Sequence, residues 1–244
     1  MNLPHFDNAA IEAATPYPEL IEAIGEAFRH GGIAPSRHVH NVPQNGEDDS
    51  VLLLMPSWND TGHFGVKLAT INAENASRDL SKIRVWGRTP DKAAEVAEWA
   101  RQNITGDAEA VGDLAAACSN ADVISAATLS REALIRGASL RPGTHVDLVG
   151  AYAADMRESD AAVFERAEQV FVDTVGGAQE EAGDLLQAIN EGALSMGDIS
   201  GDLHALAATI KLARRNNDEI TLFKSVGTGL EDLAAACLCF GAST

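Results

Sequence analysis

The chain has 244 residues, 45% of them hydrophobic, which is enough for one large or two modest globular domains with packed cores. Its 36 acidic and 18 basic residues give a formal net charge of −18, which repels nucleic-acid phosphates and anionic lipid surfaces and argues against both as partners. No apolar run is long enough to span a bilayer, and the first residues lack the features of a signal peptide, so we expect a cytoplasmic protein.

Neither the cysteines nor the histidines indicate a metal centre. Cys118, Cys237 and Cys239 lie among Ala and Leu without the spacing of metal ligands, which favours buried thiols in a reducing compartment. His38 and His40 could form a metal pair. Exposed strand histidines are the preferred interpretation, because no third ligand lies at a suitable spacing.

The first third of the chain predicts a helix followed by an antiparallel sheet. Residues 11–31 carry apolar side chains at helical spacing and end in a Gly-Gly pair, a typical helix stop. Extended segments are predicted over 33–42, 51–55 and 63–71, with a polar connection at 45–50. Lys67 lies in the last of these between Gly and Ala, where it could hold a carboxylate or act as an acid. An edge-strand lysine that discourages aggregation is an equal alternative.

Residues 82–103 form the clearest strand-to-helix transition. Apolar residues, Val96 among them, recur at helical spacing from residue 93, and we expect the Thr89 hydroxyl to cap this helix, with Pro90 in its first turn. In a doubly wound sheet the residue after the second strand meets the adenosine ribose, and an arginine there accommodates a 2′-phosphate. Arg88 occupies this place, although the residues alone slightly favour an ordinary turn with a solvated arginine.

The rest of the chain alternates strands and helices, which is typical of a parallel α/β sheet. Strands are predicted over 121–127, 144–150, 169–173 and 220–224, and helices over 111–117, 185–194 and 203–213, with a last helix from near residue 231. Such folds bind ligands at the carboxyl ends of their strands, so the residues that follow the strands should form a ligand-binding edge. These residues are Arg88, Thr128, Ser130, Gly150 and Ser225.

Six motifs follow one another along the chain. They are GVK at 65–67, VWGRTPDKA at 85–93, ATLS at 127–130, GTHVDLVGAY at 143–152, FVD at 171–173 and ITLFKSVGTGLEDLAAA at 220–236. Together, from about residue 33 onward, they resemble the ornithine cyclodeaminase/mu-crystallin family. The resemblance implies an α/β protein with a Rossmann-like parallel sheet for a dinucleotide, over residues 81–227. A second, smaller α/β domain, over residues 1–80 and 228–244, would bind substrate and form a homodimer.

The resemblance also assigns roles to individual residues. Arg37 and Lys67 match residues that hold the substrate carboxylate, with Lys67 as the catalytic residue. Gly87, Arg88 and Thr89 match the turn that binds the 2′-phosphate of NADPH (NADP). The residues that match the nicotinamide side are Thr128, Leu129, Ser130, Val149, Gly150, Ser225 and Val226.

One departure from the family pattern bears on the reaction. Cyclodeaminases resemble one another in carrying an Asp shortly after the third strand, whereas Tyr152 follows Val149, Gly150 and Ala151 here. This favours a reductase that uses NADPH on a cyclic imino acid such as Δ1-pyrroline-2-carboxylate, a reaction of proline metabolism, over an ornithine cyclodeaminase.

A second departure concerns the phosphate loop. Residues 75–80 simply join two strands, so the segment that would carry the first Rossmann strand, its glycine-rich loop and an upstream substrate-binding arginine is missing between residues 75 and 82. No GxGxxG motif occurs in the chain, and the pyrophosphate lacks its usual place at a helix N-terminus. A non-catalytic, mu-crystallin-like ligand-binding relative is therefore the alternative to the reductase.

Overall fold

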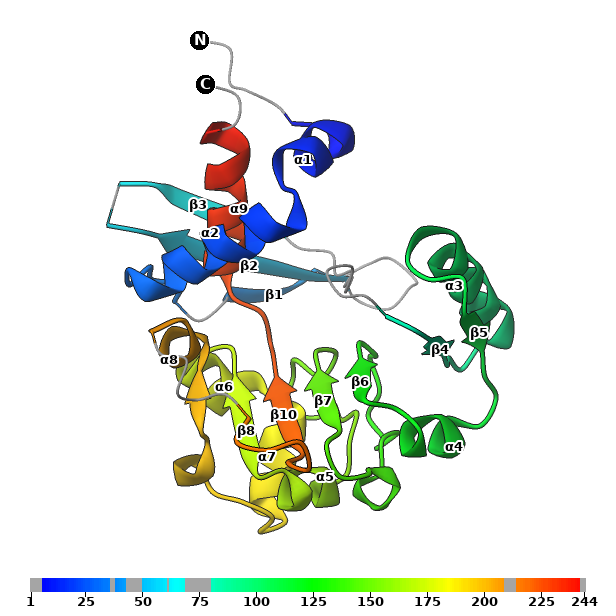
Figure 1. Cartoon of the computed structure of the whole chain (residues 1–244). Helices are drawn as coiled ribbons and strands as arrows, with labels where there is room; N and C mark the ends of the chain where they lie inside the picture. The colour runs from blue at the N-terminus through cyan, green and yellow to red at the C-terminus, as the bar shows by residue number, and fades with distance from the viewer. Residues whose placement is uncertain are drawn as a thin grey trace. The chain divides into compact units, whose positions relative to one another are not determined.

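The computed structural model describes residues 6–35, 38–42, 50–60, 62–68, 80–208 and 214–241. The chain divides into two compact units (Figure 1). Unit 1 comprises Met1–Asn72, Gly201–Leu212 and Gly227–Thr244, and unit 2 comprises Ala73–Ser200 and Ala213–Val226. The domain bounds expected from the sequence differ from these two units mainly over residues 201–212, which were expected in the dinucleotide-binding domain and lie in unit 1.

Unit 1 contains a three-stranded antiparallel sheet. Its strands are β1 (His38–Val42), β2 (Ser50–Trp58) and β3 (Phe64–Leu68), in that spatial order. Leu54 of β2 lies opposite His38 on one side and Leu68 on the other. The antiparallel pairing predicted from the polar connection is confirmed.

Four helices complete the described part of unit 1: α1 (Asn8–Ala14), α2 (Tyr17–Arg29), α8 (Leu203–Ala208) and α9 (Gly229–Gly241). The single helix predicted over 11–31 is two helices, because Pro16 takes the N-cap position of α2 in an extended conformation. Phe28, Leu230 and Leu233 form the buried cluster of this unit, with α2 packed against α9. The Ser57 hydroxyl donates to the Gly229 carbonyl at 2.8 Å and ties β2 to the start of α9.

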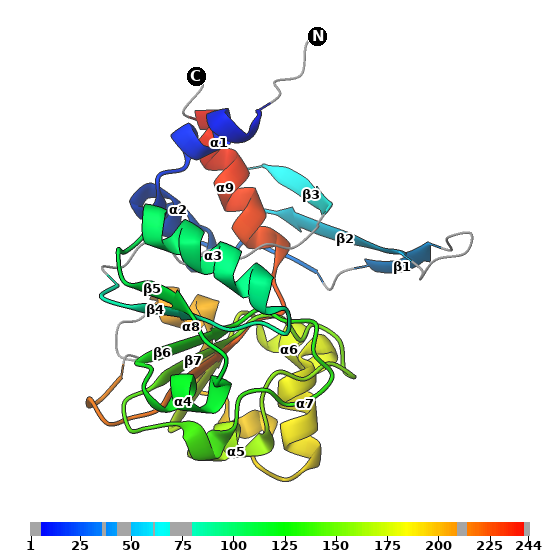
Figure 2. The same ribbon diagram turned by 90° about the vertical axis from the view of Figure 1, so that its right-hand side faces the viewer.

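Unit 2 is built on parallel sheets (Figure 2). One pairs β4 (Ile83–Val85) with β5 (Ala108–Ala110). The other has the order β6-β7-β10-β8 within unit 2, from β6 (Val123–Ala126), β7 (His145–Leu148), β8 (Gln169–Val172) and β10 (Thr221–Lys224). The two-residue strand β9 (Gly201–Asp202) belongs to unit 1. The expected parallel α/β class is confirmed, although β5 was not predicted.

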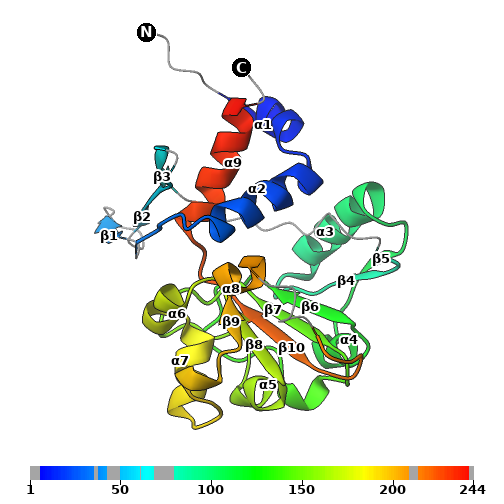
Figure 3. The same cartoon turned by 60° about the vertical axis from the view of Figure 1, so that its left-hand side comes forward.

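The helices of unit 2 are α3 (Pro90–Asn103), α4 (Leu114–Ser119), α5 (Ala161–Arg166), α6 (Val175–Glu181) and α7 (Gly183–Asn190), with 3-10 turns at Gly137–Ser139 and Met196–Asp198. Helices α5 and α6 were not predicted. They and α7 contribute Phe164, Ala178 and Leu185 to the main core, which covers one face of the larger sheet (Figure 3). On that face Val146 and Leu222 are completely buried, whereas Val123 on the opposite face is 44% exposed.

Helix α3 differs from its prediction in two details. Thr89 is its N-cap residue, but the Thr89 hydroxyl makes no capping hydrogen bond. The first turn instead contains Pro90, whose missing N–H needs no partner there. Val96 belongs to the apolar pattern of this helix and is nevertheless 52% exposed, because the helix packs through its small residues, Ala93, Ala97 and Ala100.

The cysteines are free thiols: Cys118 and Cys239 are buried and Cys237 is half-buried. Burial raises the pKa of the Cys118 and Cys237 thiols. Among the described residues, no group of histidine, cysteine and acidic side chains is arranged to hold a metal ion. None of the helices in the described ranges combines the length and apolar character needed to cross a membrane.

Candidate functional site

The carboxyl ends of β6, β7 and β10 meet at one edge of the larger sheet, where their arrowheads lie level in Figure 1. The register shows the same, since Leu148 pairs with Ala126 on one side and Lys224 on the other. Residues 127–130, 149–150 and 225–226 follow these strands, and we call these three segments the crest. The crest brings together the seven residues that the sequence assigns to the nicotinamide side: Thr128, Leu129, Ser130, Val149, Gly150, Ser225 and Val226.

A buried carboxylate joins the first two segments of the crest. Oε1 of Glu158, which is fully buried, accepts from the Thr128 amide at 2.5 Å and from the Thr128 hydroxyl at 2.8 Å. Oε2 accepts from the Gly150 amide at 2.7 Å. Burial raises the pKa of Glu158, while these donors and the nearby charge of Lys224 oppose that shift.

Gly150 is fixed by this close approach. A Cβ atom at this position would lie 1.9 Å from the Thr128 carbonyl oxygen and 2.4 Å from Oε1 of Glu158. Only glycine lets the chain pass here without moving the backbone of the neighbouring segment.

A second buried carboxylate holds the third segment of the crest. Asp173 follows β8 and is fully buried. Its Oδ2 accepts from the Val226 amide at 2.7 Å and from the Ser225 hydroxyl at 3.0 Å. Its Oδ1 accepts from the Thr174 amide at 2.6 Å. Each crest segment is therefore tied to a carboxylate that lies inside the protein.

Lys224 and Asp184 form an ion pair next to the crest, with both side chains completely buried. The Lys224 Nζ lies 3.5 Å from Oδ2 of Asp184 and donates to the Leu148 carbonyl at 3.2 Å. Oδ1 of Asp184 accepts from the amides of Glu158 and Ser159 at 2.7 and 2.8 Å. Burial lowers the pKa of Lys224, and the charges of Asp184 and Glu158 oppose that shift.

The predicted phosphate-binding turn lies at the carboxyl end of β4. Gly87 is half-buried, and Arg88 and Thr89 are exposed. Within the part of the chain that the structure describes, the Arg88 guanidinium makes no hydrogen bond or ion pair. This group can therefore accept an anion without first breaking an internal bond.

The predicted substrate-binding residues stay predictions. Arg37 lies outside the described residues. Lys67 belongs to β3, where it pairs with Met55, but its side chain also lies outside the described set. The same holds for the side chains of His38 and His40 in β1.

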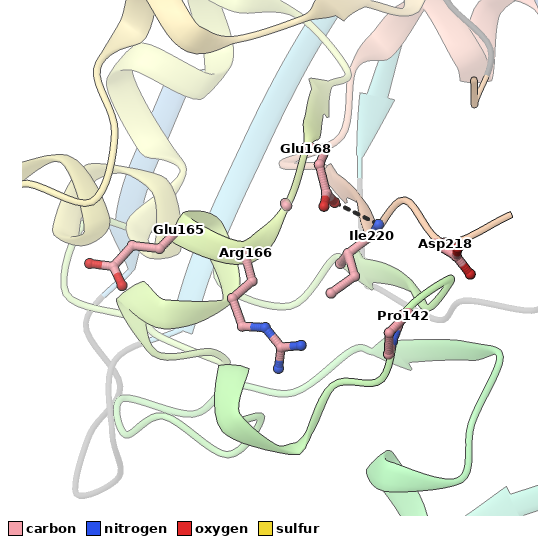
Figure 4. Close-up of a pocket in the computed structure, with 7 residues that line it drawn as sticks. Pro142, Glu165, Arg166, Glu168, Asp218 and Ile220 are labelled. Carbon is pink, nitrogen blue, oxygen red and sulfur yellow. Dashed lines mark hydrogen bonds between the residues drawn. The ribbon is translucent and has the colours of Figure 1, made fainter. Parts of the chain in front are cut away.

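Two open pockets lie at the opposite, amino end of the larger sheet. The one in Figure 4 has about 380 Å³ and is lined by Pro142, Glu165, Arg166, Ala167, Glu168, Asp218 and Ile220. Its polar side chains already hold neighbouring loops: Glu168 accepts from the Ile220 amide at 2.7 Å, and Arg166 donates to the Leu140 carbonyl at 2.8 Å. In the other, of about 480 Å³, Arg214 donates to the Gly143 carbonyl at 2.6 Å. The crest is the stronger candidate because buried carboxylates fix the positions of its three segments at the carboxyl ends of parallel strands.

Sequence reasoning missed the buried charges that hold the crest. A signal was present for Asp173 and Lys224, since each stands at the end of an otherwise apolar strand, and a charge in such a place needs a buried partner. The contacts of Glu158 with Thr128 and of Asp184 with Lys224 could not be predicted from a sequence motif, because the paired residues lie far apart in the chain and meet only in the folded structure.

Comparison with known proteins gives consistent results. The profile of the ornithine cyclodeaminase/mu-crystallin family matches residues 73–242. A Δ1-pyrroline-2-carboxylate reductase of Paracoccus denitrificans is 41% identical over 157 residues, which cover 64% of this chain and 49% of that protein. A protein of the same name from Colwellia psychrerythraea is 35% identical over 167 residues, 68% of this chain and 52% of that protein. The chain thus spans about half the length of these relatives.

A solved structure supports the fold. Thermococcus litoralis Δ1-pyrroline-2-carboxylate reductase, in complex with NADH and L-proline, superimposes with a TM-score of 0.81 at 23% identity, over 98% of this chain and 96% of that one. Because the profile matches more than half of the chain, and the α/β fold with parallel sheets agrees, the chain belongs to the ornithine cyclodeaminase/mu-crystallin family.

Proposed function

We propose that the protein is an oxidoreductase that binds a nicotinamide dinucleotide at the crest and reduces a cyclic imino acid, Δ1-pyrroline-2-carboxylate or a related ketimine, with NADPH. The observation that carries this proposal is the crest itself. Three loops at the carboxyl edge of a parallel sheet are fixed from below by buried carboxylates, at the place where doubly wound folds bind dinucleotides.

The strand order favours a Rossmann-like sheet that lacks its first strand. In a Rossmann sheet the strands lie in the spatial order 3-2-1-4-5, so position 1 lies between positions 2 and 4. Strands β5 and β4 correspond to positions 3 and 2, and β6 and β7 to positions 4 and 5. Among the described residues β4 pairs only with β5, and β6 only with β7, which leaves position 1 without a strand. This agrees with the segment that the sequence lacks between residues 75 and 82.

The residues of the chain fit the two ends of such a cofactor. Gly150 lets the first two crest segments lie close together, and Leu129, 58% exposed, offers an apolar surface to a ring. Gly87, Arg88 and Thr89 would hold the 2′-phosphate, and Arg37 and Lys67 would hold the carboxylate of the imino acid. When bound, the nicotinamide supplies the hydride, and the protein orients the two reactants.

Tyr152 argues against the deamination of ornithine. Deamination needs a general base for the δ-amine, and the phenol of a tyrosine is a poor substitute for a carboxylate in that task. The Tyr152 amide donates to the Gly150 carbonyl at 3.1 Å, so residue 152 lies directly beside the crest. Hydride transfer to an imine that is already formed does not need this base.

A non-catalytic ligand-binding protein, homodimeric like the proposed reductase, is the second candidate. The missing glycine-rich loop favours it, because the pyrophosphate of a dinucleotide then loses the backbone amides that usually bind it. Such a protein would keep a ligand at the crest and show no turnover.

The test follows NADPH absorbance with Δ1-pyrroline-2-carboxylate and, separately, ammonia release from ornithine with NAD. We expect oxidation of NADPH that requires the imino acid, and no ammonia. Ammonia release without reduction would contradict the proposal. Dinucleotide binding without either activity would favour the non-catalytic candidate.

Replacing Arg88 by alanine should remove a preference for NADPH over NADH. The exposed guanidinium can make charge-assisted hydrogen bonds to the 2′-phosphate, worth about 1.5 to 3 kcal/mol each, or about ten- to a hundredfold in affinity. Fluorescence titration of both cofactors measures this. Arg84→Ala is the matched control, because Arg84 lies in β4, just before the turn, and donates to Glu109. Equal affinities for both cofactors in the unaltered protein would refute the role of Arg88.

A further inference from the structure

Glu158 holds two loops that come from different strands. Its carboxylate receives the Thr128 amide and hydroxyl on one oxygen and the Gly150 amide on the other. The residue before it contributes as well, since the Arg157 amide donates to the Ser130 carbonyl at 2.7 Å. The relative position of the first two crest segments therefore depends on one side chain and its own backbone.

Glu158 is itself fixed on the inner side. Its amide donates to Oδ1 of Asp184 at 2.7 Å, and its carbonyl accepts from the amides of Leu134 and Ile135 at 2.9 Å. Asp184 in turn lies beside the buried Lys224 ammonium, which donates to the Leu148 carbonyl at the end of β7. Because Glu158 is held on its inner side, its carboxylate determines where the two loops lie.

We propose that Glu158 is a positioning residue: by holding Thr128 and Gly150 together, it sets the shape of the crest for the nicotinamide half of the cofactor. This inference rests on the proposed function and adds to it the role of a buried residue that acts through the loops it holds. Glu158 is fully buried and would not touch the cofactor. Its effect would pass through Leu129, which is 58% exposed although both of its neighbours are held.

Glu158→Gln is the direct test. A carboxamide has one oxygen and one NH₂ group, so whichever way it turns, a donor faces the Gly150 amide or the two donors of Thr128. At least one segment must then move. We expect NADPH to bind about tenfold or more weakly, the range for losing a charge-assisted hydrogen bond. Adenosine 2′,5′-bisphosphate carries the 2′-phosphate but no nicotinamide, so it would use the turn at residues 87–89 and not the crest. Its affinity should therefore change by no more than about twofold, which is less than the energy of one hydrogen bond.

The comparison of the two ligands separates positioning from a general loss of structure. A purely structural role would weaken both ligands or neither. Glu132→Gln is the matched control, because it makes the same chemical change on an exposed side chain near the crest. If the unaltered protein binds neither ligand, the proposed function fails; if it binds NADPH and Glu158→Gln binds it equally well, the positioning role fails.

A milder pair of variants covers the case in which Glu158→Gln does not fold. Thr128→Val keeps the side-chain volume and removes the hydroxyl that donates to Glu158 and accepts from the Ser130 amide at 3.3 Å, whereas Thr128→Ser keeps that hydroxyl. The valine variant should bind NADPH several-fold more weakly than the serine variant, about the effect of one hydrogen bond, with equal binding of adenosine 2′,5′-bisphosphate. Equal NADPH affinity in the two variants would overturn the inference.

Discussion

Replacing Lys224 by methionine should lower the free energy of unfolding by about 3 to 5 kcal/mol, the usual cost of breaking a buried ion pair. In the unaltered protein the Lys224 Nζ lies 3.5 Å from Oδ2 of Asp184. Methionine keeps most of the volume of the lysine side chain but leaves this buried oxygen without a cation. The Leu148 carbonyl also loses the donor at 3.2 Å. Urea denaturation followed by circular dichroism gives the difference from the shift of the midpoint at constant slope.

Two further variants show whether the uncompensated charge is the cause. Adding Asp184→Asn to Lys224→Met removes that charge and should recover at least half of the lost free energy. Lys92→Met makes the same side-chain change at an exposed position of α3 and should change the stability by no more than about 0.5 kcal/mol. A loss below about 1 kcal/mol in the single Lys224 variant would show that the pair is not essential to the fold.

Replacing Gly150 by alanine should both destabilise unit 2 and weaken cofactor binding at the crest. The new Cβ would lie 1.9 Å from the Thr128 carbonyl oxygen and 2.3 Å from the Thr128 amide nitrogen, so backbone rather than a flexible side chain must move. Forcing an extra methyl group into a close-packed place costs about 1 to 3 kcal/mol, and more where the backbone cannot yield. The movement would also separate the two segments that Glu158 holds.

The measurements are urea denaturation and titration with NADPH. We expect at least a tenfold loss of affinity, matching the loss of one or more charge-assisted hydrogen bonds. Gly176→Ala is the control, since a Cβ at Gly176 in α6 meets no atom within 4 Å and alanine favours a helix. NADPH affinity in Gly150→Ala equal to that of the unaltered protein would mean that the cofactor does not use this part of the crest.

Much of the architecture could be predicted because local patterns determine it. The strands before the crest are short apolar runs bounded by turn residues, and the seven crest residues fall where the carboxyl ends of those strands meet. Short elements were harder, as β5, α5 and α6 contain only 3, 6 and 7 residues and show too little periodicity. The missed break in the predicted N-terminal helix lies at Pro16, the N-cap residue of α2.

The residues that hold the crest could not be found from the sequence. Glu158 and Thr128 are separated by 30 positions, and Asp184 and Lys224 by 40, so their contacts depend on how the strands are ordered in the sheet. The exposed side of α3 was misjudged for a related reason. Val96 lies on an apolar stripe, but the packing of α3 uses alanines, which allow a closer approach than valine.

Hydrogen–deuterium exchange with and without NADPH tests the central claim, that a nicotinamide dinucleotide binds at the carboxyl edge of the larger sheet. We expect NADPH to slow exchange in residues 127–130, 149–150 and 225–226, and in the turn at 87–89, and to leave the amino-end pocket around residues 165–168 and 218–220 unchanged. Protection at the amino end, or no protection of the crest at saturating NADPH, would contradict the account.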